Sequence, residues 1–164
     1  MVTELEWAYL AGFFDGDGCV NIATRQQRKG IGPQHYLQII FSQCNQPILE
    51  YWRERVNRGR VYRTAHPDNG HKQLYQWRMF DRDAEVVLRA MLPHLHIKRK
   101  EAQIALKFQR TKREHSGRRG VAPVIIRLRE SYKRMLHEAK RGEFEAPEMV
   151  QEFERIADSQ LTLF

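Results

Sequence analysis

The stretch YLAGFFDGDG, from Tyr9 to Gly18, decides the fold of this chain. It closes a continuous apolar segment, residues 5–14, which predicts a short helix, and its glycines and aspartates predict the end of that helix. Residues 19–25 then alternate between two faces, which indicates a half-buried strand. The stretch therefore joins a helix to a strand and leaves two carboxylates at the junction.

Those carboxylates point to a metal and a second helix. Asp17 follows the negative end of the helix dipole, with Asp15 two residues earlier, so their negative charges are unfavourable there. A bound Mg²⁺ would make this interaction favourable, because Mg²⁺ selects hard oxygen ligands such as carboxylates. Ala8, Ala11 and Gly12 form a stripe of small residues, which lets two helices approach closely. If a second copy packs there, two Asp17 side chains converge, and their repulsion would require metal between them.

The rest of the chain predicts more strands and helices in alternation. Strands are expected at residues 36–43, 60–64 and 73–79, and helices at 47–58, from 81 or 83 to 92, at 98–113 and 124–140, and briefly after 147. We expect Asp81 or Asp83 to cap the second of these helices. The order α-β-β-α-β-β-α, followed by further helices, predicts an α+β fold with one four-stranded antiparallel sheet and helices on one face.

The other face of that sheet would be exposed, polar, rich in amides and basic, as a surface that reads base edges and phosphates requires. Its predicted residues are Asn21, Arg25, Gln27, Arg28, Gln38, Ser42, Arg60, Tyr62, Gln76 and Arg78.

Composition favours a polyanionic partner. The net charge over 164 residues is +8. Basic residues outnumber acidic ones by ten to three in residues 18–80 and by fifteen to four in 98–141, whereas residues 142–164 carry one basic and six acidic residues. A solvated basic surface without a ligand is the alternative, and charge alone leaves both open.

The compartment is expected to be the cell interior. An acidic N-terminus without an apolar region is unlike a secretory signal, no run of about 18 apolar residues predicts a membrane span, and two cysteines fit a reducing environment. We expect a protein of the cytoplasm and nucleoid or of an organelle, not a secreted or membrane protein.

Other interpretations of the Tyr9–Gly18 stretch are weaker. An EF-hand loop would need an oxygen ligand at Cys19 and a glycine at Val20, and a dinucleotide fingerprint would need a strand before the glycines and a helix after them. An isolated DGDG would more often be a turn after a core helix. His94 and His96 lack the partners of a zinc site, and a histidine–metal nuclease site would need three converging ligands.

The whole ten-residue pattern resembles the signature of the LAGLIDADG homing endonucleases, and the element order through about Arg113 agrees with it. The resemblance implies a site-specific, intron-encoded DNA endonuclease with one motif per chain. It implies a homodimer whose motif helices form the two-fold interface, at Ala8, Ala11 and Gly12, and whose sheets lie as a saddle in the DNA major groove. The target would be a long pseudo-palindromic duplex, and the cofactor Mg²⁺ or Mn²⁺, with Ca²⁺ binding without supporting cleavage.

The resemblance also assigns site residues. Asp17 matches the metal-binding acid, aided by the Gly16 carbonyl, and Asp15 matches a position tied to packing or helix termination. Gln43 matches a position that orders water, and Lys98 a cation near the scissile phosphate, with an ordinary helix-start cation as the alternative. The family often has another cation soon after the glutamine, which this chain lacks, and Arg53 or Lys100 could substitute.

One further function remains open, that of a LAGLIDADG-fold protein that no longer cleaves and acts as an RNA maturase or a DNA-binding regulator. Asp17 favours the enzyme, because a pure binder has no need of an acid at a helix end.

The expected organisation is one domain over residues 1–164, with a core at 1–113, C-terminal helices at 124–159 and an apolar tail at 160–164. The tail, QLTLF, resembles the motif by which bacterial replication and repair proteins bind the sliding clamp, through Gln160, Leu161, Leu163 and Phe164. The alternative is that its apolar side chains pack back onto the helices.

Overall fold

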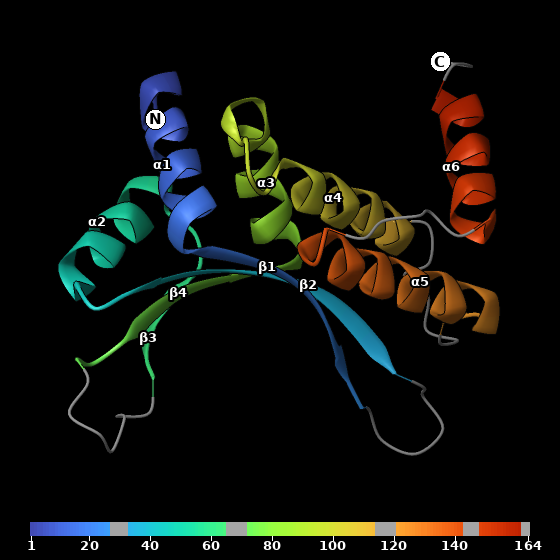
Figure 1. Ribbon diagram of the computed structural model, residues 1–164, viewed down its shortest axis with the longest axis horizontal. Helices are drawn as coiled ribbons and strands as arrows, with labels where there is room; N and C mark the ends of the chain where they lie inside the picture. The colour runs from blue at the N-terminus through green and yellow to red at the C-terminus, as the bar shows by residue number, and fades with distance from the viewer. Residues whose placement is uncertain (27–32, 65–71, 114–120, 143–147, 162–164) are drawn as a thin grey trace.

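The computed structural model describes residues 1–26, 33–64, 72–113, 121–142 and 148–161, with only the backbone described at 113, 149 and 156–161. Figure 1 shows one sheet that curves like an arch, with the helices gathered over its convex side and the concave side left open. The predicted α+β fold, with helices on one face of a four-stranded antiparallel sheet, is confirmed.

The elements follow the predicted order. They are α1 (Glu4–Asp17), β1 (Gly18–Arg25), β2 (Gln34–Gln43), α2 (Gln46–Val56), β3 (Arg60–Arg63), β4 (Tyr75–Phe80), α3 (Asp81–Met91), the 3₁₀ turn η1 (Leu92–His94), α4 (Arg99–Arg113), α5 (Pro123–Lys140) and α6 (Glu148–Leu161).

The sheet has the order β1-β2-β4-β3, and every neighbouring pair is antiparallel. Its register places Val20 beside Ile39 and Met79 on the convex side, where all three are buried beneath the helices. Successive side chains of a strand point to opposite faces, so the residues between them face the concave side. The predicted inward positions of the first two strands are thus confirmed.

The core is centred where α1 crosses the sheet. Phe14 of α1 lies against Phe41 of β2, with ring centroids 4.9 Å apart, and Phe41 stacks on Trp77 of β4 at 4.8 Å. All three side chains are fully buried, and Trp77 donates its indole N–H to the Arg58 carbonyl at 2.8 Å. Aromatic pairs of this kind add to the free energy of area burial, so the motif helix is fixed firmly on the sheet.

Helix α1 ends within the stretch Asp15–Gly18, where the glycines and aspartates predicted its end. It begins at a capping box between Thr3 and Glu6 and continues through Gly16 to Asp17. It ends where the Gly18 N–H bonds to the Phe14 carbonyl. A Cβ atom at Gly18 would lie 2.1 Å from the Phe14 ring, so only glycine fits where the helix turns into β1. The carboxylates therefore sit on the last helical turn.

The expected cap of the third helix is wrong. Phe80 occupies the N-cap of α3 without a side-chain bond, and Asp81 has a positive φ of 43°. The Asp81 carboxylate instead accepts the Leu37 backbone N–H at 3.0 Å and the Lys112 ammonium at 2.5 Å. Asp81 thus connects β2 and α4, because hydrogen bonds to a charged carboxylate from these partly buried donors stabilise the fold more than a cap bond would.

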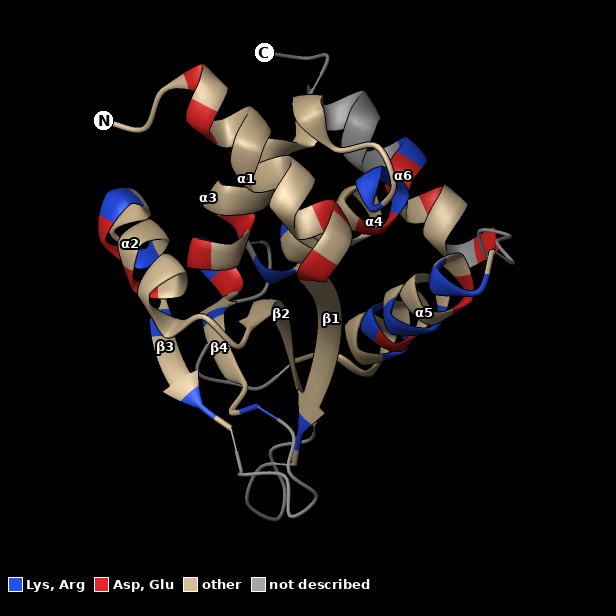
Figure 2. Cartoon of the chain, turned by 60° about the vertical axis from the view of Figure 1, so that its left-hand side comes forward, with Lys and Arg blue, Asp and Glu red and all other residues tan. Residues whose placement is uncertain are grey.

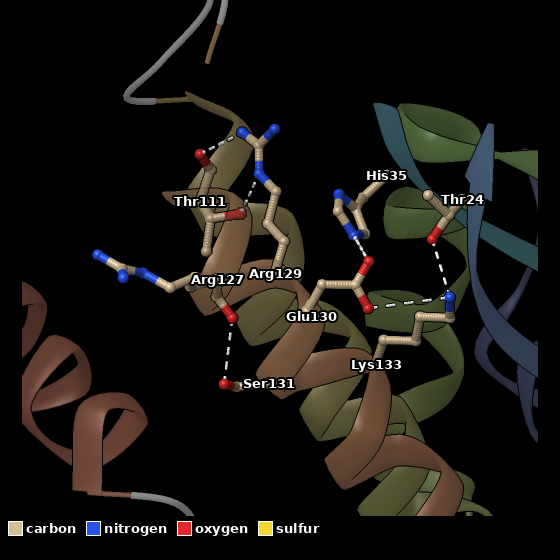
Figure 3. Close-up of polar contacts among 8 residues, drawn as sticks. All are labelled: Thr24, His35, Thr111, Arg127, Arg129, Glu130, Ser131 and Lys133. Atoms are coloured by element: carbon tan, nitrogen blue, oxygen red, sulfur yellow. Dashed lines mark hydrogen bonds and ion pairs between the residues drawn. The ribbon is translucent and has the colours of Figure 1, made fainter. Parts of the chain in front are cut away.

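Polar contacts attach α5 to the sheet and to α4 (Figure 3). The buried His35 of β2 meets the Glu130 carboxylate at 2.5 Å, and Lys133 donates to the Thr24 hydroxyl at 2.9 Å. The buried Arg129 donates to the Thr111 carbonyl of α4 at 2.9 Å. The C-terminal helices are therefore joined to the β1–β2 half of the sheet, and α6, at 14 residues, is longer than the short helix expected.

Candidate active site and nucleic-acid interface

Asp17 and Gln43 meet at the end of the motif helix. Asp17 is the last residue of α1 and Gln43 the last of β2, and the Gln43 amide donates to the Asp17 carboxylate at 2.9 Å. The Gln43 carbonyl oxygen accepts the Cys44 backbone N–H at 3.1 Å, which fixes the orientation of the amide. Asp17 is exposed, so its second oxygen can face a ligand. The structure brings together two residues that the sequence predicted from separate elements.

Asp15 and Lys98 cap each other's helices. The Asp15 carboxylate accepts the backbone N–H groups of His96, Ile97 and Lys98 at 2.8, 3.1 and 2.8 Å, which are the donors at the start of α4. The Lys98 ammonium donates to the Asp15 carbonyl at 2.5 Å, where α1 ends and its carbonyls lack helical partners. Lys98 thus lies beside the last turn of α1, where its bonding partner Asp15 precedes Asp17 by two residues.

These contacts set the pKa of Asp15. Burial alone would raise it, but the three backbone donors and the charge of Lys98 outweigh burial and hold the pKa below its ordinary value of 3.8. Asp15 is therefore ionised, and its carboxylate is occupied by the three backbone donors, as the structural role in the family resemblance implied.

Glu101 is a residue of this region that sequence reasoning missed. It is half-buried in the first turn of α4, and burial raises its pKa, with Lys140 and Lys98 opposing that rise and Asp15 adding to it. It shows that α1, α4 and the end of α5 converge electrostatically. Its position one helical turn after Lys98 was the available signal.

The donors at the end of α1 suit a hard divalent cation. Asp17 offers an exposed carboxylate, and the carbonyl of Gly16 lies in the last turn, where helical carbonyls lack i+4 partners. No basic side chain occupies that turn of α1, and Figure 2 shows acidic residues where the helix meets β1. Within the described residues, no three His, Cys, Asp or Glu side chains converge as a metal site. Asp17 and the Gly16 carbonyl are the candidate ligands at the end of α1.

An exposed face of α1 lies beside the candidate ligands Asp17 and Gly16. Leu5 and Tyr9 are 82% and 60% exposed, and a Cβ atom at Gly12 or Gly16 would meet nothing within 4 Å. These residues recur along one side of the helix. The expected stripe needs one correction, because Ala11 is fully buried in the core of its own chain, while Ala8 is partly exposed.

The concave face carries most of the polar residues predicted to read DNA. Strand register places on it Asn21, Arg25, Gln38, Ser42, Arg60, Tyr62, Gln76 and Arg78. Gln27, Arg28 and the turn at 67–70 lie outside the described residues, as do the tail's Leu163 and Phe164. Gln160 and Leu161 end the backbone of α6.

The same face includes apolar residues that the sequence reasoning left out. Tyr36 and Phe80 form a ring contact at 5.9 Å, and Ile40 lies between Cys19 and Arg78 in the register. The alternation of the second strand already gave Tyr36 and Ile40, and they were missed because only polar side chains were sought.

Arg53, one of the two residues offered as a substitute cation, is engaged within α2. It pairs with Glu50 at 2.7 Å and Glu54 at 3.0 Å. Lys100 is exposed in the first turn of α4, close in sequence to Lys98. Lys100 therefore has the more exposed side chain of the two.

Known structures share this fold. The homing endonuclease I-CvuI in complex with its target matches with a TM-score of 0.68 and 20% identity, over 82% of this chain and 81% of that one. The archaeal intron-encoded homing endonuclease I-Vdi141I, complexed with DNA, matches with a TM-score of 0.68 and 14% identity, over 96% and 98%. The LAGLIDADG homing endonuclease I-SmaMI, bound to cleaved DNA, matches at 0.62 and 16%, over 77% of this chain and 42% of that one.

The sequence matches no protein-family model and no curated protein. The structural matches nevertheless define the fold, and this chain has the fold of the LAGLIDADG homing endonucleases, as its motif implied. Among the described helices, none has the length and apolar character needed to cross a bilayer.

Replacing Asp15 by Asn should destabilise the protein by about 1–3 kcal/mol above pH 5, because three partly buried backbone donors lose their charged acceptor. The pKa of Asp15 is lowered on folding, so its contribution is present above 3.8 and lost as pH falls through the folded-state value. Urea unfolding at several pH values should therefore show wild type and D15N converging in acid. An equal gap at every pH would contradict this role.

Proposed function

We propose that this protein is a site-specific DNA endonuclease that cuts both strands of a duplex as a homodimer. The observation that carries the proposal is the contact of Gln43 with Asp17 at the end of the motif helix, beside a concave polar sheet face. Lys98 bonds to the Asp15 carbonyl in the same helical turn. Three proteins with this fold are described as homing endonucleases with DNA, which supports DNA as the substrate class.

The dimer would form through the open face of α1. Glycine in a helix interior costs about 1 kcal/mol relative to alanine, and Gly12 has free space around it within its own chain. Leu5 and Tyr9 flank it as large exposed apolar side chains, which a second copy of α1 would bury. Such packing would bring two Asp17 carboxylates together and form a site for divalent cations between the two chains.

Asp17 and the Gly16 carbonyl would hold a divalent cation, Mg²⁺ or Mn²⁺. When bound, such a cation activates water and neutralises charge on a phosphodiester. Gln43 would hold the Asp17 carboxylate and order water beside it. Lys98 uses one of its three N–H donors on α1, and the others would face the phosphate charge. We expect Ca²⁺ to bind at the same oxygens without supporting cleavage.

The sheets of the two copies would place their concave faces in the major groove of a long pseudo-palindromic target. The alternative function, a maturase or regulator that binds without cleaving, is less well supported. It leaves no use for an exposed acid that a glutamine from another element holds in place.

Replacing Asp17 by Asn should abolish Mg²⁺-dependent cleavage, with a loss beyond the roughly 10–100-fold that removal of an outer-shell partner costs. DNA binding should stay equal or tighten, because a negative charge is removed. Plasmid cleavage and gel-shift assays measure the two separately, and Glu54→Gln, at an exposed acid of α2, is the control. A D17N protein that still cuts DNA with Mg²⁺ would overturn the metal assignment.

We also propose that the tail QLTLF binds a sliding clamp, on the strength of its sequence. The described part of α6 lies on the helical side of the molecule, away from the concave face, so a partner there would leave the DNA surface open (Figure 1). Deleting residues 160–164 should remove binding to a purified bacterial clamp, with melting temperature and cleavage of short duplexes unchanged. A large loss of thermal stability would show instead that the tail belongs to the core.

A further inference from the structure

Four side chains on the concave face form one hydrogen-bonded and stacked group. The Gln76 carbonyl oxygen accepts two N–H groups of Arg78, from Nε at 2.9 Å and from Nη2 at 2.5 Å. The Gln76 amide nitrogen lies 3.3 Å from the Ser42 hydroxyl, to which it donates. The Arg78 guanidinium also lies over the Tyr62 ring, 5.1 Å from its centroid. Three strands, β2, β4 and β3, thus contribute to holding one arginine.

The orientation of the Gln76 amide follows from chemistry. Arginine has only donors, so the Gln76 oxygen must face Arg78 and its nitrogen must face Ser42. The register agrees, since Gln76 lies directly between Ser42 and Tyr62 across the sheet. The oxygen accepts two bonds and has no lone pair left for a base.

This commitment limits what Gln76 can read. A glutamine that reads adenine uses its oxygen and its nitrogen together, in a bidentate contact. Gln76 has one N–H left and no acceptor, so it cannot make that bidentate contact while it holds Arg78. Its structural effect is on Arg78.

Arg78, by contrast, keeps the N–H donors at the end of its guanidinium that could bond to a base. The two bonds to Gln76 use one edge of the guanidinium, and within the described chain no contact uses Nη1. The end of the guanidinium, with one N–H from each terminal nitrogen, remains as the fork that fits the O6 and N7 atoms of guanine. Stacking on Tyr62 and the bonds to Gln76 fix the direction of that fork before DNA arrives.

We propose that Arg78 reads a guanine in the major groove of each half-site, and that Gln76 is a positioning residue for Arg78 and not an independent base reader. This inference rests on the proposed function, because it needs the concave face to lie on DNA. Preorganisation is its physical basis: an arginine already held in its binding geometry loses less side-chain entropy on contact.

The test is selection of bound sequences from a random duplex library by the full-length protein without added divalent cations, followed by competition binding. Wild type should enrich a guanine at one position of each half-site. Arg78→Ala should lower that guanine preference by about ten-fold or more. Gln76→Ala should lower the preference at the same base pair only, and R78A/Q76A should lose no more than R78A, because the two residues act as a unit.

Gln76→Glu is the rescuing variant, since a carboxylate keeps the acceptor for Arg78. It should retain the guanine preference while binding all sequences more weakly. Arg89→Ala removes an exposed arginine from α3, on the helical side of the sheet, and is the matched control that should leave the base preferences unchanged.

Three results would overturn the inference. Loss of an adenine preference at another position in Q76A would make Gln76 a direct reader. An even loss of affinity over all sequences in R78A would make Arg78 a phosphate contact. A wild-type protein that enriches no sequence would overturn the proposed function and this inference with it.

Discussion

The reciprocal capping of α1 and α4 is the interaction on which the rest of the structure depends. The Asp15 carboxylate takes the three backbone donors before α4, and the Lys98 ammonium takes the Asp15 carbonyl at the end of α1. Each helix thereby supplies the charge that the other's dipole favours. The Asp15 carboxylate is occupied by these backbone donors, so Asp17 is the exposed acid of this helix end. Lys98 is fixed at the same helix end by its bond to the Asp15 carbonyl. The same contacts hold α1 over the sheet, where Phe14 and Gly18 lock its exit into β1.

This arrangement divides the molecule into two working surfaces. Under the proposed function, the concave side of the sheet would present amides, arginines and aromatic rings to DNA, and the end of α1 would present the acid for cleavage. The open face of α1, with Gly12 and Gly16, connects them, because a second copy there would complete both the acid pair and the DNA saddle. Binding, cleavage and dimerisation are in this account three uses of one helix and the sheet below it.

Much of this could be predicted from the sequence, for identifiable reasons. Alternation in residues 19–25 and 36–43 gave the faces of β1 and β2, because side-chain period is a local property. Ala11 and Asp81 were misassigned because both depend on tertiary partners, Ala11 being buried in the core and Asp81 being used by Leu37 and Lys112. The binding of Gln76 to Arg78 was equally out of reach, since spacing places both on one face and says nothing of which atoms they share.

The proposed function requires two copies of α1 in contact, and sedimentation of Gly12→Leu beside wild type tests this requirement most directly. A Cβ atom at Gly12 would meet nothing within 4 Å in its own chain, so the variant should still fold. We expect wild type to sediment at twice the chain mass of 19.6 kDa and to cut both strands, while G12L should sediment at 19.6 kDa and cut neither. A G12L protein that remains dimeric and active, or a wild type that cuts both strands as a monomer, would contradict it.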